Sequence, residues 1–227
     1  MRTKAVFFDM YETLITHYRS PLYFGAEMAK DAGISVNDFF RLWRDPIIDH
    51  DRTIGKITLE ELLCRILKEN NHYDETLVNE LVSKRTSVKE ECFRHLHDEI
   101  IPLLTELKKR DIRIVLVSNC YLEEAKVIRE SLLFPFFDRV CLSCEEGIAK
   151  PDKEIFLKAI HEFSLKPEEC LYVGDGGSRE LETAAELGMN PVQAVWYLLE
   201  NTSQPSKRKT GFIQAESPLD VLNYLKH

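Results

Sequence analysis

The 227-residue sequence lacks the features that would place it in a specialised class of protein. No apolar run approaches the roughly 20 residues that a helix needs to cross a bilayer. The N-terminus shows no signal-peptide pattern, so we expect a cytoplasmic location. Internal repeats and low-complexity tracts are also missing. What remains is an ordinary globular composition, 44% hydrophobic and 30% charged, over a length that suits a core domain with a smaller insertion.

An excess of positive charge is also lacking. The formal net charge is -8, which argues against a nucleic-acid partner, because such proteins carry a basic excess. We therefore expect neither a nucleic-acid nor a membrane partner. Nothing in the sequence indicates an oligomeric state.

Cysteine is present but not in a metal-binding or disulfide pattern. Cys141 and Cys144 have C-x-x-C spacing, yet no second cysteine pair and no histidine pair at zinc spacing accompanies them. Cys141 also lies in an apolar run. We predict that the six cysteines are free thiols, which a reducing cytosol would keep unpaired.

Short apolar runs alternating with helical patterns predict the core. The five predicted strands are 5–8, 112–117, 139–142, 171–173 and 192–196. The intervening helices are predicted at 121–133, 153–163 and 179–187, the last one closed by Gly188. This alternation is typical of βαβ units, so the predicted fold class is α/β, with a doubly wound, parallel-sheet (Rossmann-like) core.

The long segment between the first two strands has only helical patterns. Helices are predicted at 21–32, 37–44, 58–69 and 74–87, and a further helix at 99–110 leads back to the sheet. We interpret residues 16–99 as an all-helical cap domain inserted into a core of residues 1–15 and 100–227, able to exclude water from a site beneath it. We expect substrate specificity to come from 45–57, with Gly55 as a hinge. The basic run Lys207-Arg208-Lys209 is expected in an exposed loop, 201–210.

Polar motifs follow four successive predicted strands. They are Asp9 with Thr13, Ser118-Asn119, Lys150-Pro151-Asp152, and the turn from Gly174 to Glu180 that contains Asp175. Each alone is a common turn or loop sequence. Ligands of open parallel sheets bind outside the carboxyl ends of the strands, so the four together predict one site.

In this order the motifs resemble those of the haloacid dehalogenase-like hydrolase superfamily. Residues 9–13 (Asp-Met-Tyr-Glu-Thr) resemble its nucleophile motif, and Ser118, Lys150 and the Asp175/Glu180 pair resemble the other three. The inserted helices resemble its cap. The resemblance implies a covalent aspartyl mechanism on a small phosphorylated or halogenated molecule, with the catalytic residues Asp9, Tyr11, Thr13, Ser118 and Lys150.

Physical chemistry supports these roles. A carboxylate such as Asp9 can form a covalent intermediate that water later hydrolyses. Ser118 and nearby N–H groups can donate to an anion, and Lys150 supplies fixed positive charge. Asp9, Asp175 and a main-chain carbonyl, which we assign to Tyr11, offer oxygen ligands for Mg²⁺, with Glu180 reaching the metal through water.

Tyr11 occupies the position where phosphatases of the superfamily usually carry a second aspartate. A phenol, with a reference pKa of about 10, is a poor general base at neutral pH. Tyrosine here resembles the 2-haloacid dehalogenases, which use a cap arginine; Arg44 and Arg41 are the candidates for binding substrate, together with Asn119.

Retention of Asp175 and Glu180 points instead to a metal. Three hypotheses therefore stay open: a Mg²⁺-dependent phosphatase acting on a small phosphorylated metabolite, a metal-independent 2-haloacid dehalogenase, and a low-activity binding or regulatory protein.

Overall fold

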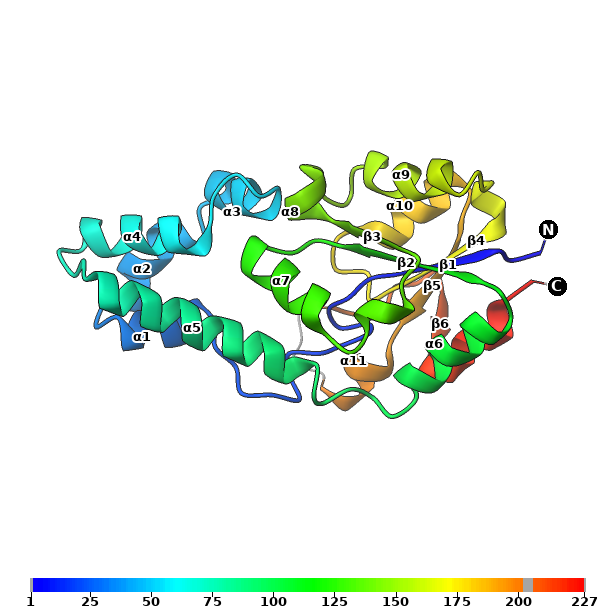
Figure 1. Cartoon of the computed structure of the whole chain (residues 1–227), viewed down its shortest axis with the longest axis horizontal. Helices are drawn as coiled ribbons and strands as arrows, with labels where there is room; N and C mark the ends of the chain where they lie inside the picture. Colours follow the sequence, from blue (N-terminus) through cyan, green and yellow to red (C-terminus); the bar gives the residue numbers. More distant parts are fainter. Residues whose placement is uncertain (1, 202–205, 227) are drawn as a thin grey trace.

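The computed structural model describes residues 2–201 and 206–226. Its centre is a parallel sheet of order β3-β2-β1-β4-β5-β6 (Figure 1). The strands are β1 (Ala5–Phe8), β2 (Arg113–Ser118), β3 (Arg139–Leu142), β4 (Cys170–Gly174), β5 (Asn190–Ala194) and β6 (Ile213–Ala215). The chain winds outward from β1 to one edge, then returns to β4 on the other side of β1. This order confirms the predicted doubly wound α/β core.

Both faces of the sheet are buried, as the unbroken apolar runs predict. Successive side chains of β1 point to opposite faces, so Val6 and Phe8 enter one hydrophobic cluster, and Ala5 and Phe7 enter another. Helices cover each face. Those of the core are α6 (Ile100–Lys109), α7 (Leu122–Glu130), α8 (Ser143–Glu146), α9 (Glu154–Glu162), α10 (Glu180–Leu187) and α11 (Trp196–Glu200). Short 3₁₀ turns span Phe134–Phe136 (η1), Pro167–Glu169 (η2) and Pro218–Tyr224 (η3).

Five further helices lie beyond the carboxyl ends of the strands (Figure 1). They are α1 (Gly25–Asp31), α2 (Val36–Trp43), α3 (Pro46–Thr53), α4 (Leu59–Glu69) and α5 (Glu75–Cys92). These helices share a hydrophobic cluster separate from the two that flank the sheet. We call this group of helices the cap.

Local sequence explains where the cap helices begin. The Ser35 hydroxyl accepts a hydrogen bond from the Asp38 N–H, and Thr58 and Glu61 form the predicted capping box. Helix α5 is longer than predicted, because it continues to Cys92 and reaches the core helix α7. The segment 45–57, where substrate specificity was expected, contains helix α3.

Gly55 is a point of close contact rather than an open hinge. Its φ is +77°, and a Cβ built there would lie 2.0 Å from the carbonyl oxygen of Cys144 in α8. The Ser143 hydroxyl also donates to the carbonyl of Thr53 at 2.7 Å. The cap chain after α3 is thus packed directly on the core.

Two predictions near the C-terminus were wrong. The fifth strand ends at Ala194, and Trp196 begins helix α11, since a short apolar run suits a buried helix as well as a strand. Strand β6 was not predicted; it is a three-residue edge strand, and Ile213 is 53% exposed.

The loop expected at 201–210 falls partly outside the described residues, which omit 202–205. Lys207 and Arg208 are exposed, as predicted. Lys209 instead forms an ion pair with Glu182 at 2.7 Å, and Ser206 contacts Asp175. Part of this loop therefore lies against the core rather than in solvent.

All six cysteines are free thiols, as predicted, and Cys120 and Cys144 have their sulfur atoms 3.8 Å apart. Within the described part of the chain, every helix is too short or too polar to cross a membrane.

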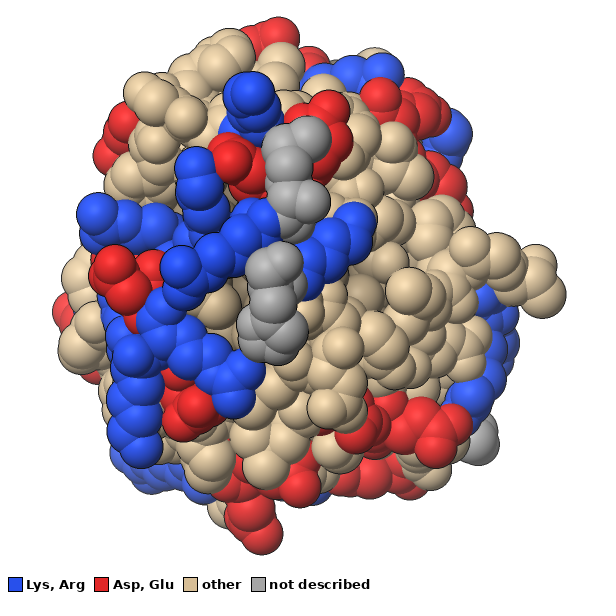
Figure 2. All heavy atoms as spheres, turned by 90° about the vertical axis from the view of Figure 1, so that its right-hand side faces the viewer, with Lys and Arg blue, Asp and Glu red and all other residues tan. Residues whose placement is uncertain are grey.

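Charges of both signs cover the end of the molecule where the strands begin. Figure 2 shows Lys and Arg side chains in a band across this face, with Asp and Glu among them. Lys4 pairs with Glu169 at 2.8 Å, and Lys108 and Arg113 both pair with Asp138. The polar motifs lie at the opposite edge of the sheet.

Candidate active site

The site is built where the strand order reverses, between the neighbouring strands β1 and β4. Asp9 directly follows β1 and Asp175 directly follows β4, and the Asp9 N–H donates to the Val173 carbonyl at 2.9 Å. Because the two strands are parallel and in register, these carboxylates meet at one edge of the sheet.

Asp9 and Lys150 form a buried ion pair. Lys150 Nζ lies 2.7 Å from Asp9 Oδ1, and the two residues are 4% and 7% exposed. The same oxygen accepts the Met10 N–H at 2.8 Å. Burial opposes the charge of Lys150, but Asp9 and Glu180 outweigh it and raise the pKa of Lys150 above its usual value. Lys150 therefore places a positive charge beside Asp9, and its role in catalysis stays a prediction.

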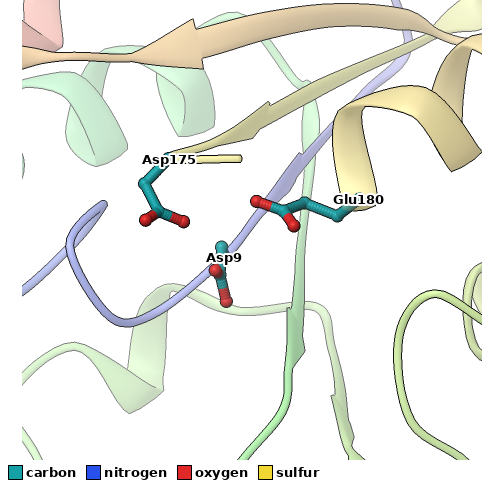
Figure 3. Close-up of side chains that lie close together, drawn as sticks. All are labelled: Asp9, Asp175 and Glu180. Atoms are coloured by element: carbon teal, nitrogen blue, oxygen red, sulfur yellow. The ribbon is translucent and has the colours of Figure 1, made fainter. Parts of the chain in front are cut away.

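Three buried carboxylates gather at this point. Asp9, Asp175 and Glu180 each offer an oxygen, and these oxygens all lie within 4.8 Å of one another (Figure 3). Burial, followed by the charges of Asp9 and Glu180, raises the pKa of Asp175 to about 7. Such crowding of like charge is relieved by a cation, and carboxylate oxygens are the ligands that hard divalent ions prefer. The cluster fits a divalent metal.

Glu180 also shapes the turn between β4 and α10. Its two carboxylate oxygens accept the N–H groups of Gly176 and Ser178, both at 2.6 Å. Gly176 has a φ of +95°, which glycine adopts without strain. Asp175 accepts the Gly177 N–H at 3.1 Å and a hydrogen bond from the Ser206 hydroxyl. Glu180 thus holds the loop that carries Asp175.

Ser118 and Asn119 follow β2. Ser118 is fully buried, and its hydroxyl donates to the Asn119 carbonyl at 3.4 Å. The Asn119 amide donates to the Lys150 carbonyl at 2.9 Å, and its oxygen accepts the Lys150 N–H at 2.8 Å. Both ends of this side chain hold the backbone of Lys150, so Asn119 positions that lysine. Direct contacts of Ser118 and Asn119 with a substrate stay predictions.

The Tyr11 ring lines the cavity at Asp9, but its hydroxyl lies inside the protein. Among the described residues this hydroxyl has no hydrogen-bond partner, and burial and the charge of Glu124 raise its pKa well above the usual value. Thr13 is fully buried, and its hydroxyl likewise has no partner within the described residues. The phenol of Tyr11 is not placed to act as a base beside Asp9.

The predicted cap arginines do not reach the cavity. Arg41 pairs with Glu69 at 2.8 Å on the exposed surface, and the Arg44 guanidinium lies 3.8 Å from the centre of the Phe40 ring. Arg41 lies in the last turn of α2 and Arg44 is the residue that ends it, and the sequence motif did not define how this helix packs. The assignment of Arg41 and Arg44 to the substrate is therefore not supported by their positions.

Other residues also line the cavity, and sequence reasoning missed most of them. The cavity has a volume of about 340 Å³. Beside the predicted Tyr11, its lining includes His17, Tyr18, Phe24 and Ser206. Residues 17–24 form the connection from the core to α1. Their sequence has no motif, so only the path of the chain could reveal them.

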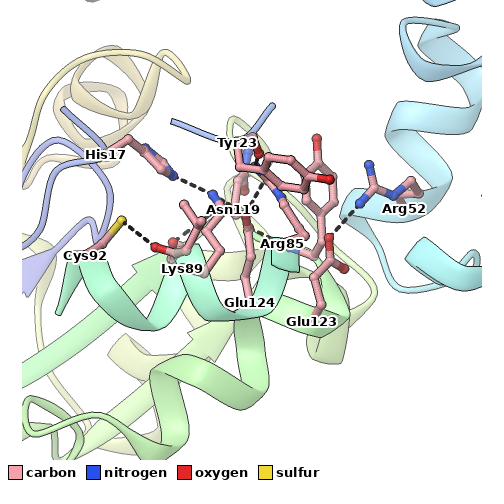
Figure 4. Close-up of polar contacts among 12 residues, drawn as sticks. His17, Tyr23, Arg52, Arg85, Lys89, Cys92, Asn119, Glu123 and Glu124 are labelled. Carbon is pink, nitrogen blue, oxygen red and sulfur yellow. Dashed lines mark hydrogen bonds and ion pairs between the residues drawn. The ribbon is translucent and has the colours of Figure 1, made fainter. Parts of the chain in front are cut away.

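Buried ion pairs join the cap to helix α7 of the core (Figure 4). Arg52 of α3 lies 2.7 Å from Glu123, and both side chains are nearly fully buried. Lys89 of α5 lies 2.6 Å from Glu124, and Arg85 lies 3.4 Å from the same carboxylate. The adjacent acids Glu123 and Glu124 thus hold two different cap helices.

The fold and the site define a hydrolase of the doubly wound α/β class with a helical cap. A sequence model described as haloacid dehalogenase-like hydrolase matches residues 3–188, which is most of the chain. The protein belongs to the haloacid dehalogenase-like (HAD) hydrolase family.

Individual relatives include both phosphatases and dehalogenases. The chain is 27% identical over 196 residues to the glyceraldehyde 3-phosphate phosphatase of Methanocaldococcus jannaschii, covering 84% of each chain. Its fold is similar to that of a HAD phosphatase from Thermococcus onnurineus (TM-score 0.67, 18% identity, 97% of each chain).

Two more solved structures share this fold. One is a HAD family enzyme from Bacteroides thetaiotaomicron in complex with magnesium and inorganic phosphate (TM-score 0.63, 18% identity, 83% of this chain and 92% of that one). The other is the L-2-haloacid dehalogenase of Xanthobacter autotrophicus with chloropropionic acid covalently bound (TM-score 0.62, 16% identity, 97% of each chain). At these identities the structural likeness establishes the fold alone.

Proposed function

We propose that this protein is a Mg²⁺-dependent phosphatase that cleaves a small phosphate monoester, with Asp9 as the nucleophile. The observation that carries the proposal is the buried cluster of Asp9, Asp175 and Glu180 beside Lys150. Halide displacement needs no cation, whereas transfer of a phosphoryl group to a carboxylate brings two anions together. The similarity to a phosphatase along 84% of the chain agrees with this choice.

Asp9 has one oxygen held and one free to attack. Oδ1 accepts hydrogen bonds from Met10 and Lys150. Oδ2 takes no hydrogen bond from the described residues, and we assign it the attack on phosphorus. As the new Oδ2–P bond forms, the ester P–O bond breaks, and the leaving group departs as an alkoxide that takes its proton from solvent water. A second water molecule then hydrolyses the aspartyl phosphate to inorganic phosphate and the free Asp9 carboxyl group. Lys150 orients Asp9 and opposes the rise in the pKa of Asp9 that burial causes.

Asp9, Asp175 and the Tyr11 main-chain carbonyl would hold the metal, with Glu180 as an outer partner. When bound, Mg²⁺ would neutralise charge on the carboxylates and on the phosphoryl oxygens. Glu180, through Gly176 and Ser178, keeps the Asp175 loop in the conformation that binds the cation. The residues 16–99 would serve as the cap that excludes water from this site.

The absence of a second aspartate at position 11 should limit the rate at which this enzyme releases the leaving group. Tyr11 directs its hydroxyl into the protein and keeps its proton, so it gives no acid to the departing alcohol. Loss of general acid help costs roughly 10²–10⁴-fold in rate. We therefore expect turnover to rise steeply for esters whose leaving groups need no proton.

The experiment follows from that expectation. Hydrolysis of p-nitrophenyl phosphate is measured with Mg²⁺ and with EDTA, for the wild type, for Asp9→Asn and for the exposed control Asp38→Asn. We expect Mg²⁺-dependent turnover in the wild type and in the control, and none in Asp9→Asn. Wild-type turnover that EDTA leaves unchanged, or no turnover at all, contradicts the proposal.

Tyr11 is the observation that favours a second candidate, a metal-independent 2-haloacid dehalogenase. EDTA-insensitive release of halide from 2-chloropropionate would support it. Against this candidate, Arg41 and Arg44 lie away from Asp9, and the acidic cluster is retained. The third candidate, a low-activity binding or regulatory protein, would be removed by turnover of any substrate in a phosphometabolite panel.

A further inference from the structure

One wall of the cavity is aromatic. Tyr11, His17, Tyr18 and Phe24 line it, and the Tyr11 and His17 rings stack with centroids 4.7 Å apart and 11° between their planes. A phosphate ester with its phosphoryl group at Asp9 would place its leaving group against this wall. At about 340 Å³ the whole cavity is near the lower limit for ligand sites, which is about 300 Å³, so the leaving group must be small.

Three buried cations near this wall, Lys150, Lys89 and Arg85, are bound to carboxylates. Lys150, the cation that lines the cavity in the described part of the chain, is paired with Asp9. Lys89 is 3% exposed and lies 2.6 Å from Glu124. Arg85 is equally buried, and it donates to the Tyr23 carbonyl at 2.5 Å and pairs with Glu124 (Figure 4). All three cations are paired within the protein, so we expect none of them to bind an anionic leaving group.

His17 is also committed to the protein. Lys89 can only donate, so the 2.5 Å contact makes Nε2 of His17 the acceptor and leaves the proton on Nδ1. Nδ1 donates to Glu12 Oε1 at 3.1 Å, and the other Glu12 oxygen accepts the Thr16 hydroxyl. His17 therefore presents a ring to the cavity, with both nitrogens already bonded.

The segment outside the described residues adds no cation by its sequence. Residues 202–205 are Thr, Ser, Gln and Pro. The cavity lining also includes the carboxylates of Asp9, Glu12 and Asp175, so its fixed charge opposes a second anionic group on the substrate.

We propose that the leaving-group side of the cavity selects a short, uncharged alcohol, such as a polyol or hydroxyaldehyde, and rejects alcohols that carry a carboxylate. This inference rests on the proposed function and names the substrate class of the same site. The selecting residues are Tyr18 and Phe24, which offer ring surface, together with the ring of His17 that the Lys89–His17–Glu12 chain holds in place. Glu12 and His17 are positioning residues in this scheme.

The test compares two alkyl phosphates whose leaving groups differ mainly in charge. They are sn-glycerol 3-phosphate (uncharged) and 2-phosphoglycolate (anionic), with p-nitrophenyl phosphate as a measure of phosphatase activity. We expect kcat/KM for glycerol phosphate to exceed that for phosphoglycolate at least about tenfold, because the carboxylates of the lining oppose a second anionic group.

A charge introduced into the wall should change that preference. Tyr18→Arg places a cation beside the leaving group, and Tyr18→Met is a matched uncharged control. We expect Tyr18→Arg to raise the phosphoglycolate-to-glycerol phosphate ratio of kcat/KM about tenfold, while Tyr18→Met leaves that ratio near the wild-type value.

The outcomes separate the two proposals. An enzyme that hydrolyses p-nitrophenyl phosphate but prefers phosphoglycolate to glycerol phosphate, or hydrolyses neither alkyl ester, overturns the inference and leaves the proposed function standing. An enzyme that hydrolyses none of the three esters overturns the proposed function, and this inference with it. The kcat/KM values of the wild-type enzyme for these esters test the inference even if Tyr18→Arg fails to fold.

Discussion

Arg52 and Glu123 form a buried ion pair, 2.7 Å long, between a cap helix and a core helix. The Arg52 guanidinium also lies 3.8 Å from the centre of the Tyr121 ring, and Tyr121 donates to Asp49 at 2.7 Å. Because the ion pair is shielded from water, removal of one partner leaves a buried unpaired charge, which costs far more than loss of a surface pair.

Breaking this pair should destabilise the protein strongly. Arg52→Met leaves Glu123 buried and unpaired, so we expect the free energy of unfolding to fall by about 3–5 kcal/mol. Arg41→Met is the matched control, since it removes an exposed pair with Glu69 and should cost less than about 1 kcal/mol. Urea denaturation of the three proteins measures both changes. Equal losses in the two variants would mean that Arg52 and Glu123 contribute no more than a surface pair.

Glu124 should make the stability of the protein sensitive to acid. Burial opposes its charge, but Lys89 and Arg85 outweigh that effect and lower the pKa of Glu124 to about 2, from 4.5. The folded state therefore favours the charged form. The contribution of the Glu124 carboxylate to the free energy of unfolding is fully present above pH 4.5 and is lost as the pH falls through about 2.

The variant Glu124→Gln isolates this contribution. We expect the difference in unfolding free energy between wild type and variant to be largest near pH 7 and to shrink steadily below pH 4.5. Urea titrations at several pH values measure it. A difference that does not change with pH would contradict the assignment.

Metal binding should release a proton from Asp175. Its pKa is about 7 in the metal-free protein, so below that pH the carboxyl must ionise before it can bind Mg²⁺. We expect affinity for Mg²⁺ to weaken by up to about tenfold for each pH unit below 7. Calorimetric titration in two buffers of different ionisation enthalpy counts the protons released. Asp175→Asn is the control and should bind weakly at every pH, whereas equal proton release at pH 6 and pH 8 would argue against this role.

Gly55 should tolerate no side chain. Gly55 and Gly147 both have left-handed φ values, +77° and +68°, but only at Gly55 would a Cβ meet the Cys144 carbonyl. Alanine in this conformation costs about 1–2 kcal/mol at either position. We expect Gly55→Ala to lose a further 1–3 kcal/mol or so from the clash. Thermal denaturation of both variants compares them, and equal shifts in Tm would mean that the cap moves aside freely.

The sequence was sufficient to predict the elements whose signals are local. Asp9, Lys150 and Asp175 could be placed because each follows an apolar run, and parallel strands deliver their carboxyl ends to one edge of the sheet. Glu180 was predicted beside them, but its hydrogen bonds to Gly176 and Ser178 depend on the path of the turn and could not be anticipated.

What the sequence could not predict depends on tertiary packing. Arg44 was selected by its position in the sequence, yet at the end of α2 its guanidinium packs on the Phe40 ring instead of entering the cavity. His17 carries no motif; it lines the cavity because the chain turns back after β1 and stacks it on Tyr11. Trp196 was assigned to a strand, since burial in an apolar run does not distinguish strand from helix.

The neighbouring positions of β1 and β4 determine when the site can exist during synthesis. Asp9 leaves the ribosome well before its partner Asp175, which follows only after the whole cap and three further strands have been made. A nascent chain can therefore bury the hydrophobic cluster of its cap long before it can assemble the carboxylate cluster. Chains released before β4 would carry a cap with no metal site beneath it.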